Sequence, residues 1–185
     1  DETQLDWTRY DSDPNSWRTR YIGEALQNAF SLSTYGFDHI IGNCNSAPAW
    51  LKTNGQHNDG GTLIANGESE FSEFLVAFLT GMESRYGIEV TAISPTNEPD
   101  YDVSYESMNT TPSELSSILI NLNARLSNSG LDHINIVSPE CFRVESQNSS
   151  TSATNYINSM FNNSAVEEAV DIVGTHTYAD PNHNA

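Results

Sequence analysis

The sequence has few basic residues and no long apolar run, and each scarcity excludes a class of partner. Its 185 residues include 7 Lys and Arg against 25 Asp and Glu, so the formal net charge at pH 7 is −18. This charge argues against nucleic acid and anionic membranes, which are themselves negatively charged. No segment approaches the roughly 18 consecutive apolar residues of a membrane span. We therefore expect no nucleic-acid partner and no membrane partner, and the sequence indicates no oligomeric state.

Cysteine is also scarce, which argues against a disulfide scaffold and a zinc site. The chain has only Cys44 and Cys141, and their spacing fits no zinc motif. The five histidines are scattered, and the nearest pair, His176 and His183, lacks the spacing of metal ligands on a helix. We expect two unbridged thiols, no metal site and no cofactor.

The composition favours a secreted protein. Charged residues make up 17% of the chain, below the roughly 25% of average soluble domains, and Asn, Ser and Thr supply much of the polarity. The chain begins with Asp1 rather than Met, so we expect any targeting segment to have been removed. Asn109, Asn148 and Asn162 begin sequons that permit N-glycosylation, although chance explains most sequons in a chain so rich in Asn and Ser.

Short apolar runs alternate with segments of helical period, which predicts an α/β fold. Runs rich in Ile and Val predict strands at 39–44, 89–94, 133–138 and 171–176. Apolar residues at helical spacing predict helices over 22–30, 71–82, 115–126 and 156–161. The segment Thr111-Pro112-Ser113-Glu114 predicts a capping box at the start of the third helix, and Gly130 predicts its end. Without a hairpin signal, the strands should be parallel and joined by right-handed crossovers.

Polar residues at the ends of the predicted strands favour a (β/α)8 barrel over an open doubly wound sheet. In a barrel, residues at the C-terminal ends of the strands meet on one face, where such folds keep their active sites. No G-x-G-x-x-G motif follows a strand, which argues against a dinucleotide-binding fold. The polar residues in question are Asn43, Asn45, Ser46, Asn97, Glu98, Glu140, His176 and Tyr178.

The most specific local signal is Asn97-Glu98-Pro99, which directly follows a predicted strand. Pro99 removes a backbone donor and biases Glu98 away from helical geometry, so the carboxylate stays at the rim of the sheet. Asn97 can donate a hydrogen bond to a substrate hydroxyl beside it. The alternative is a strand-terminating turn with a solvated Glu98.

Four other segments carry motifs in the same order along the chain. They are SAPAWLKTNG at 46–55 followed by GGTL at 60–63, YESM at 105–108, SPE at 138–140 and VGTHTY at 173–178. They resemble motifs of glycoside hydrolase family 30: S-P-P-A-W-M-K-T-N-G after strand three, Y-E-S-C or Y-E-S-M, A-P-E-S closing strand five, and G-G-H-x-Y closing strand six. The resemblance covers about residues 40–180. It implies a (β/α)8 barrel and a retaining glycosidase.

The resemblance also assigns roles to single residues. Glu98 corresponds to the general acid/base, and Asn97 to the neighbour that contacts the sugar at the cleavage subsite. Glu140 corresponds to an accessory site residue; its alternatives are a buried structural carboxylate, a nucleophile, or the base of an inverting mechanism. His176 and Tyr178 lie on one face of strand six, either in the site, where Tyr178 would position the nucleophile, or as a core pair.

Two further positions concern the sugar-binding surface. Asn45 stands where the xylanase-like branches of the family have a Trp, so a flat apolar wall is absent and the substrate is in doubt. Trp50 is interpreted either as a structural wedge under its loop or as a sugar platform. Both are included among the candidate substrate-binding residues, together with Asn97, Glu140, His176 and Tyr178.

The family nucleophile is a Glu at the end of strand seven, and this chain stops just after strand six. We therefore expect the nucleophile beyond Ala185, and residues 1–185 to form one incomplete (β/α)8 catalytic domain, roughly strands two or three to six, without the first and last strands. The 185-residue chain alone should be inactive. The expected activity is hydrolysis of a β-linked polysaccharide, either xylan-like or β-1,6-glucan-like or galactan-like. The alternative is a non-catalytic carbohydrate-binding or structural extracellular glycoprotein on the same barrel.

Overall fold

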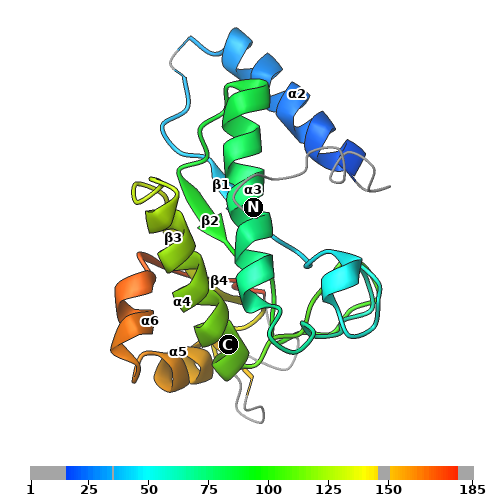
Figure 1. Ribbon diagram of the computed structural model, residues 1–185, viewed down its shortest axis with the longest axis vertical. Helices are drawn as coiled ribbons and strands as arrows, with labels where there is room; N and C mark the ends of the chain where they lie inside the picture. Colours follow the sequence, from blue (N-terminus) through cyan, green and yellow to red (C-terminus); the bar gives the residue numbers. More distant parts are fainter. Residues whose placement is uncertain (1–15, 35, 146–150, 179–185) are drawn as a thin grey trace.

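The computed structural model describes residues 16–34, 36–145 and 151–178. Strands and helices alternate along the chain, as predicted (Figure 1). In chain order the elements are α2 (Ser16–Leu32), β1 (Ile41–Asn43), the 3-10 turn η1 (Ala49–Leu51), α3 (Glu68–Tyr86), β2 (Ala92–Ser94), α4 (Pro112–Asn128), β3 (Asn135–Cys141), α5 (Ala153–Met160), α6 (Ser164–Ala169) and β4 (Ile172–Thr175).

The four strands form one parallel sheet in the order β1-β2-β3-β4. Strands adjacent in sequence are therefore adjacent in the sheet, as in a barrel, whereas a doubly wound sheet reverses its order at a switch point. The α/β fold with parallel strands is confirmed. Because all the strands run in the same direction, their C-terminal ends lie along one edge of the sheet.

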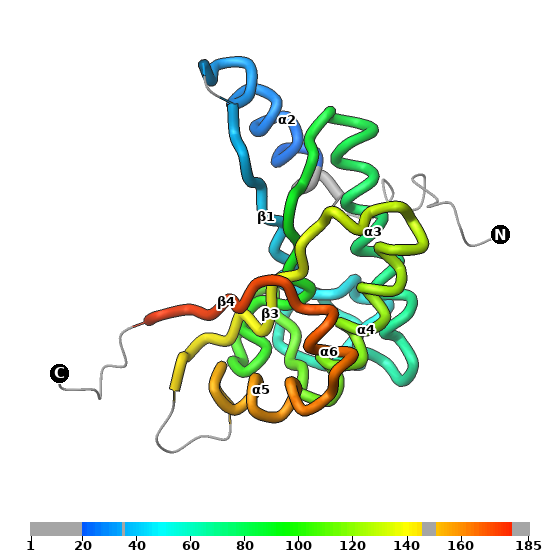
Figure 2. Tube along the Cα trace, turned by 90° about the vertical axis from the view of Figure 1, so that its left-hand side faces the viewer, coloured from blue at the N-terminus to red at the C-terminus, as the bar shows by residue number. Residues whose placement is uncertain are grey.

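The core lies between the sheet and the helices that cover one of its faces. Figure 2 shows α3, α4 and α6 on the same side of the strands. The predicted apolar stripe of α4 is buried, and that of α3 is buried except for Phe74 and Phe78, which are partly buried against the core. Arg125 of α4 links the two helices through an ion pair of 3.2 Å with Glu73. None of the described helices is long and apolar enough to span a membrane. The buried stripe residues are Phe71, Leu75, Leu79 and Met82 on α3 and Leu115, Ile118, Leu119, Leu122 and Leu126 on α4.

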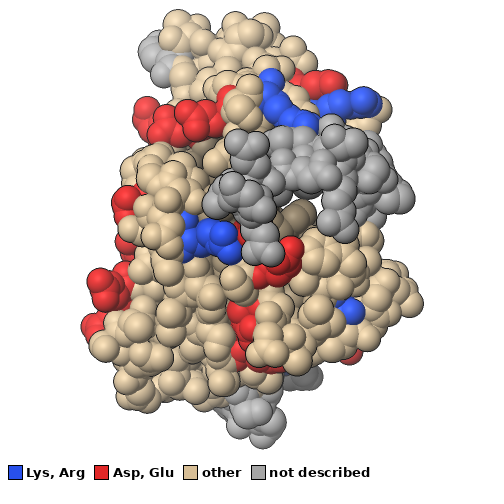
Figure 3. Space-filling view, viewed as in Figure 1, with Lys and Arg blue, Asp and Glu red and all other residues tan. Residues whose placement is uncertain are grey.

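The surface reflects the charge of the sequence. On the face that Figure 3 shows, Asp and Glu side chains are spread over several elements while Lys and Arg are few. The edge strands of the sheet also expose apolar side chains, and Ile41 of β1 and Val173 of β4 are more than half exposed. Exposed apolar residues on parallel edge strands are typical of a sheet that continues into further strands.

Three local differences from the sequence-based prediction have simple causes. The helix α6 was not predicted, because six residues are too few for a helical period to show. The first strand starts at Ile41 rather than at position 39, because the Ile40 N–H donates to the Thr91 hydroxyl instead of to a backbone carbonyl of the neighbouring segment. By contrast, α4 begins with the predicted capping box, in which the Thr111 and Glu114 side chains each accept a hydrogen bond from the other residue's backbone N–H.

Candidate active site

Two carboxylates meet at the C-terminal edge of the sheet, each on an unusual stretch of backbone. Glu98 follows β2 with φ 49°, and Glu140 lies near the end of β3 with φ 55°. Residues other than glycine rarely adopt such left-handed geometry, and it persists only where the surroundings hold it. One restraint is direct, because the Glu98 N–H donates to the Glu140 carbonyl at 2.9 Å. The ends of β2 and β3 are thus locked together at the two carboxylates.

His176, which follows β4, lies between these carboxylates. Its Nδ1 is 2.7 Å from Glu98 Oε1, and its Nε2 is 3.5 Å from Glu140 Oε2. The two nitrogens point away from opposite sides of the imidazole, so the ring separates the two carboxyl groups. The Glu98 side chain is buried, with 6% exposed. The contact with His176 therefore fixes the position of the Glu98 carboxyl at the edge of the sheet.

An amide network connects the end of β1 to the same cluster. Asn43 Nδ2 is 3.2 Å from Asn97 Oδ1 and 3.5 Å from Glu140 Oε2. The Asn97 oxygen accepts this hydrogen bond, so the NH2 group of Asn97 points away from Asn43 and is directed toward other acceptors. Asn43 was named among the polar residues at the strand ends but not among the candidate substrate-binding residues. Its position near the end of a predicted strand was the signal in the sequence that pointed to the site.

Three aromatic rings stack beside the carboxylates. Phe142 lies between Tyr101, at a ring-centroid distance of 4.1 Å, and Tyr178, at 4.7 Å. The Tyr178 ring also meets the His176 ring edge-on at 5.4 Å. The negative charge of Glu98 raises the pKa of Tyr178, with smaller contributions from desolvation and from a hydrogen bond between these two side chains. The structure therefore brings His176 and Tyr178 together at the strand end rather than in the core.

A buried lysine ties together the loops after β1 and β2. The Lys52 Nζ donates to the Ser46 hydroxyl at 3.0 Å and to the Ser107 carbonyl at 2.6 Å. Burial lowers the pKa of Lys52, because the charged form loses solvation. Ser107 in turn accepts a hydrogen bond from the Gly60 N–H through its hydroxyl. These contacts fix the loop that leads away from Glu98.

Asn45 and Trp50 take no part in the contacts described above between Glu98, Glu140, His176 and Asn43. Asn45 is exposed after β1. Trp50 is 58% exposed on η1, while the next residue, Leu51, is buried. Successive side chains of a 3-10 turn point in different directions, so burying Leu51 turns Trp50 outward. The interpretation of Trp50 as a structural wedge under its loop does not fit a side chain that is 58% exposed.

The remaining expected features have mixed outcomes. Cys44 and Cys141 are free thiols, and burial raises the pKa of Cys44 to about 12. The Oδ1 of Asn109 is fully buried, whereas Asn162 is exposed at the turn before α6. Asn148 lies outside the described residues. Within those residues, no group of three or more His, Cys, Asp or Glu side chains could hold a metal ion.

Residues 15–179 match the family model for O-glycosyl hydrolase family 30. The chain belongs to this family. The match includes every strand of the sheet and every residue of the cluster around Glu98. The resemblance inferred from the motifs is thereby confirmed.

Solved structures agree with the fold. The chain is 24% identical to the family 30 subfamily 8 xylanase Xyn30A from Clostridium acetobutylicum, with a TM-score of 0.72 over 96% of this chain and 41% of that one. It is 16% identical to the endo-β1,6-glucanase BT3312, with a TM-score of 0.75 over 86% of this chain and 35% of that one. It is 21% identical to SrfJ from Salmonella typhimurium, with a TM-score of 0.72 over 83% of this chain and 33% of that one. The chain thus spans 33 to 41% of these structures and has the fold of the central portion of a (β/α)8 barrel.

Proposed function

We propose that the protein is a retaining glycoside hydrolase of β-linked polysaccharide in which Glu98 is the general acid/base. The observation that carries this proposal is the contact of 2.7 Å between the buried Glu98 carboxyl and His176 Nδ1 at the C-terminal edge of the sheet. Family membership supports the reaction class. The contacts of His176 and Glu140 suggest their roles in the same reaction.

In the first step, Glu98 gives its proton to the oxygen of the glycosidic bond as that bond breaks. A nucleophilic carboxylate attacks the anomeric carbon and forms a glycosyl-enzyme intermediate. In the second step, Glu98 takes a proton from water, which releases the sugar with its configuration retained. His176 holds the Glu98 carboxyl in place through both steps, and Glu140 anchors the other ring nitrogen of His176.

The position of His176 argues against Glu140 as nucleophile or as base. A retaining pair needs carboxyl groups about 5–5.5 Å apart around the sugar, and an inverting pair needs room for a water between them. The imidazole contacts both Glu98 and Glu140, so it takes the space in which the sugar or the water would lie. We therefore assign the nucleophile to a Glu beyond Ala185, in a domain of which residues 1–185 are one part.

The proposed substrate is a β-linked polysaccharide, either xylan-like or β-1,6-glucan-like or galactan-like. Structures with the same fold include a xylanase and an endo-β1,6-glucanase. Asn97 offers its NH2 group to a sugar hydroxyl, and the exposed faces of Trp50 and Tyr178 offer apolar surface to a sugar ring. With Asn45 in place of a Trp, that position contributes a hydrogen bond instead of stacking. Such a substrate implies an extracellular protein, and among the described sequons the exposed Asn162 is the better glycan acceptor.

The test is a comparison of Glu98→Gln with the wild-type protein in its complete encoded form. Xylan and a β-1,6-glucan are incubated with each protein, the reducing ends are counted, and the anomeric configuration of the first product is read by NMR. We expect retained configuration for wild type and a rate about 10²- to 10⁴-fold lower for the variant, because the transferable proton is lost while the shape remains.

Glu89→Gln is the matched control. Glu89 precedes the same strand at the opposite edge of the sheet and is exposed, so its substitution should leave the rate unchanged. An inverted product would reject the retaining mechanism. Binding of either glycan without any hydrolysis would favour the non-catalytic carbohydrate-binding alternative.

A further inference from the structure

A buried tyrosine on α5 reaches the loop that carries Glu98. Tyr156 is 2% exposed, and its hydroxyl donates to the Thr110 carbonyl at 2.5 Å. The same hydroxyl is 3.4 Å from the Pro99 carbonyl. Tyr156 therefore joins α5 to the two ends of the segment that runs from Glu98 to the start of α4.

The two ends of that segment are also bonded to each other. The Thr110 N–H donates to the Pro99 carbonyl at 3.1 Å, and Pro99 directly follows Glu98. Besides the direct contact with Pro99, a path of hydrogen bonds therefore leads from the phenol through Thr110 to the residue beside Glu98. Glu98 has a left-handed backbone, which only its surroundings can maintain.

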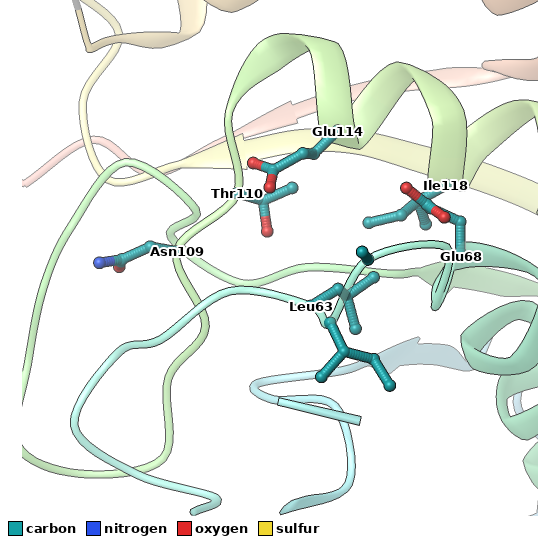
Figure 4. Close-up of a pocket in the computed structure, with 8 residues that line it drawn as sticks. Leu63, Glu68, Asn109, Thr110, Glu114 and Ile118 are labelled. Atoms are coloured by element: carbon teal, nitrogen blue, oxygen red, sulfur yellow. The ribbon is translucent and has the colours of Figure 1, made fainter. Parts of the chain in front are cut away.

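The Thr110 side chain is buried next to a space in the packing. A small cavity of about 70 Å³ lies between the first turns of α3 and α4, and Leu63, Glu68, Glu114 and Ile118 contribute to its lining (Figure 4). The Thr110 hydroxyl points toward this space in Figure 4, and it has no hydrogen-bond partner among the described residues. Hydrogen bonds to its backbone, rather than a partner for its hydroxyl, hold Thr110 in position.

We infer that Tyr156 is a positioning residue for the acid/base: its hydroxyl holds the Thr110–Pro99 backbone, which keeps the Glu98 carboxyl aimed at the leaving oxygen. This inference rests on the proposed function of Glu98. Burial raises the pKa of Tyr156, with smaller contributions from Cys141, Asp100 and Glu114. The phenol thus keeps its proton, and remains a donor, over the whole pH range of an enzyme assay.

The experiment separates positioning of the acid from general loss of structure. Aryl glycosides with a poor leaving group need protonation by Glu98 when the glycosidic bond breaks, whereas dinitrophenyl glycosides leave without it. In the complete protein, Tyr156→Phe should lower kcat/KM about tenfold for the poor leaving group, which is the size of one buried hydrogen bond. For the dinitrophenyl substrate it should change kcat/KM less than about twofold. A purely structural defect would lower both values by the same factor.

Two further variants complete the test. Tyr86→Phe removes a hydroxyl from a partly buried tyrosine of α3 and should leave both values unchanged. Replacement of Tyr156 by 4-aminophenylalanine keeps an N–H donor at the same place, so the buried carbonyl keeps its partner and the wild-type ratio between the substrates should return.

The outcomes separate the inference from the proposed function. If Glu98→Gln discriminates between the substrates but Tyr156→Phe lowers both equally, the inference on Tyr156 is wrong and the acid/base assignment stands. An aminophenylalanine variant that behaves like Tyr156→Phe would also overturn the inference. If Glu98→Gln does not discriminate, the proposed function fails, and the inference fails with it.

Discussion

Asn43 offers a direct test of the amide network at the end of β1. Its NH2 group fixes the orientation of the Asn97 amide through the contact of 3.2 Å and lies 3.5 Å from Glu140. Asn43→Ala removes both contacts and leaves the Asn97 side chain free to rotate. In this variant, the Asn97 amide would first have to rotate into place before it could donate the proposed hydrogen bond to a sugar hydroxyl. In the wild-type protein, Asn43 already holds the amide in that orientation.

The size of the effect follows from the two distances. The contact with Asn97 counts as one neutral hydrogen bond, worth about 0.5–1.5 kcal/mol, and the contact with Glu140 is at the limit of hydrogen bonding. At about 1.4 kcal/mol for each factor of ten, kcat/KM for a β-glycan should fall about 2- to 12-fold. Asn43→Asp should lower it further, because that carboxylate cannot donate and lies against Glu140.

The assay compares kcat/KM of the complete proteins on one glycan, with thermal unfolding of each. Asn43 is exposed, so the unfolding temperature should stay almost constant. Asn135→Ala is the control, because Asn135 is an exposed amide that also bonds across the sheet but lies at the opposite edge. If Asn43→Ala retains full kcat/KM, or loses no more than Asn135→Ala, the amide network does not orient Asn97.

Two further predictions concern stability. Thr111→Ala removes the helix cap of α4, so it should lower the free energy of unfolding by about 1 kcal/mol and the unfolding temperature by about 2–4 °C. Thr110→Val removes a hydroxyl without a hydrogen-bond partner among the described residues, so the unfolding temperature should stay equal or rise. Calorimetry that shows the opposite order of the two variants would contradict this account. Burial raises the pKa of Asp100 above its ordinary value of 3.8, so this side chain stabilises the fold below that pH and the contribution is lost as the pH rises through the folded pKa. Asp100→Asn keeps an acceptor for the Phe142 N–H and should unfold at a higher temperature than wild type at pH 7, with the difference vanishing near pH 3.8; an equal difference at both pH values would disprove the linkage.

The sequence predicted the parts of the fold that depend on neighbouring residues. The apolar periods of α3 and α4 appear as buried stripes, and the capping box at Thr111 starts α4 as expected. The parallel strands followed from the alternation of elements. Because parallel strands end on one edge, the structure also brings Asn97, Glu98, Glu140 and His176 together as the strand-end argument expected.

The contacts that organise the site could not be predicted, because they join distant segments. Asn43 and Glu140 are 97 positions apart, and the phenol of Tyr156 meets a backbone carbonyl 46 positions away. Tyr156 was identified only as an apolar member of a helix, since a helical period indicates burial and not the partner of a hydroxyl. Trp50 shows the converse limit, because the sequence gives no indication of which side of a tight turn an aromatic residue will face.

The unusual backbone at the two carboxylates explains why Gly174, which has no side chain, belongs to the site. A Cβ at Gly174 would overlap Glu140 Oε1 and come within 2.7 Å of Val137 Cγ1. Glycine on β4 therefore leaves the space through which the Glu140 carboxylate, set by its left-handed backbone, reaches toward His176. His176 stands two residues further along the same strand direction, so one short segment both admits Glu140 and supplies the ring that contacts it. Glu98 then depends on three strand ends at once: on β2 for its position, on the Glu140 carbonyl for its backbone N–H, and on His176 for its carboxyl group.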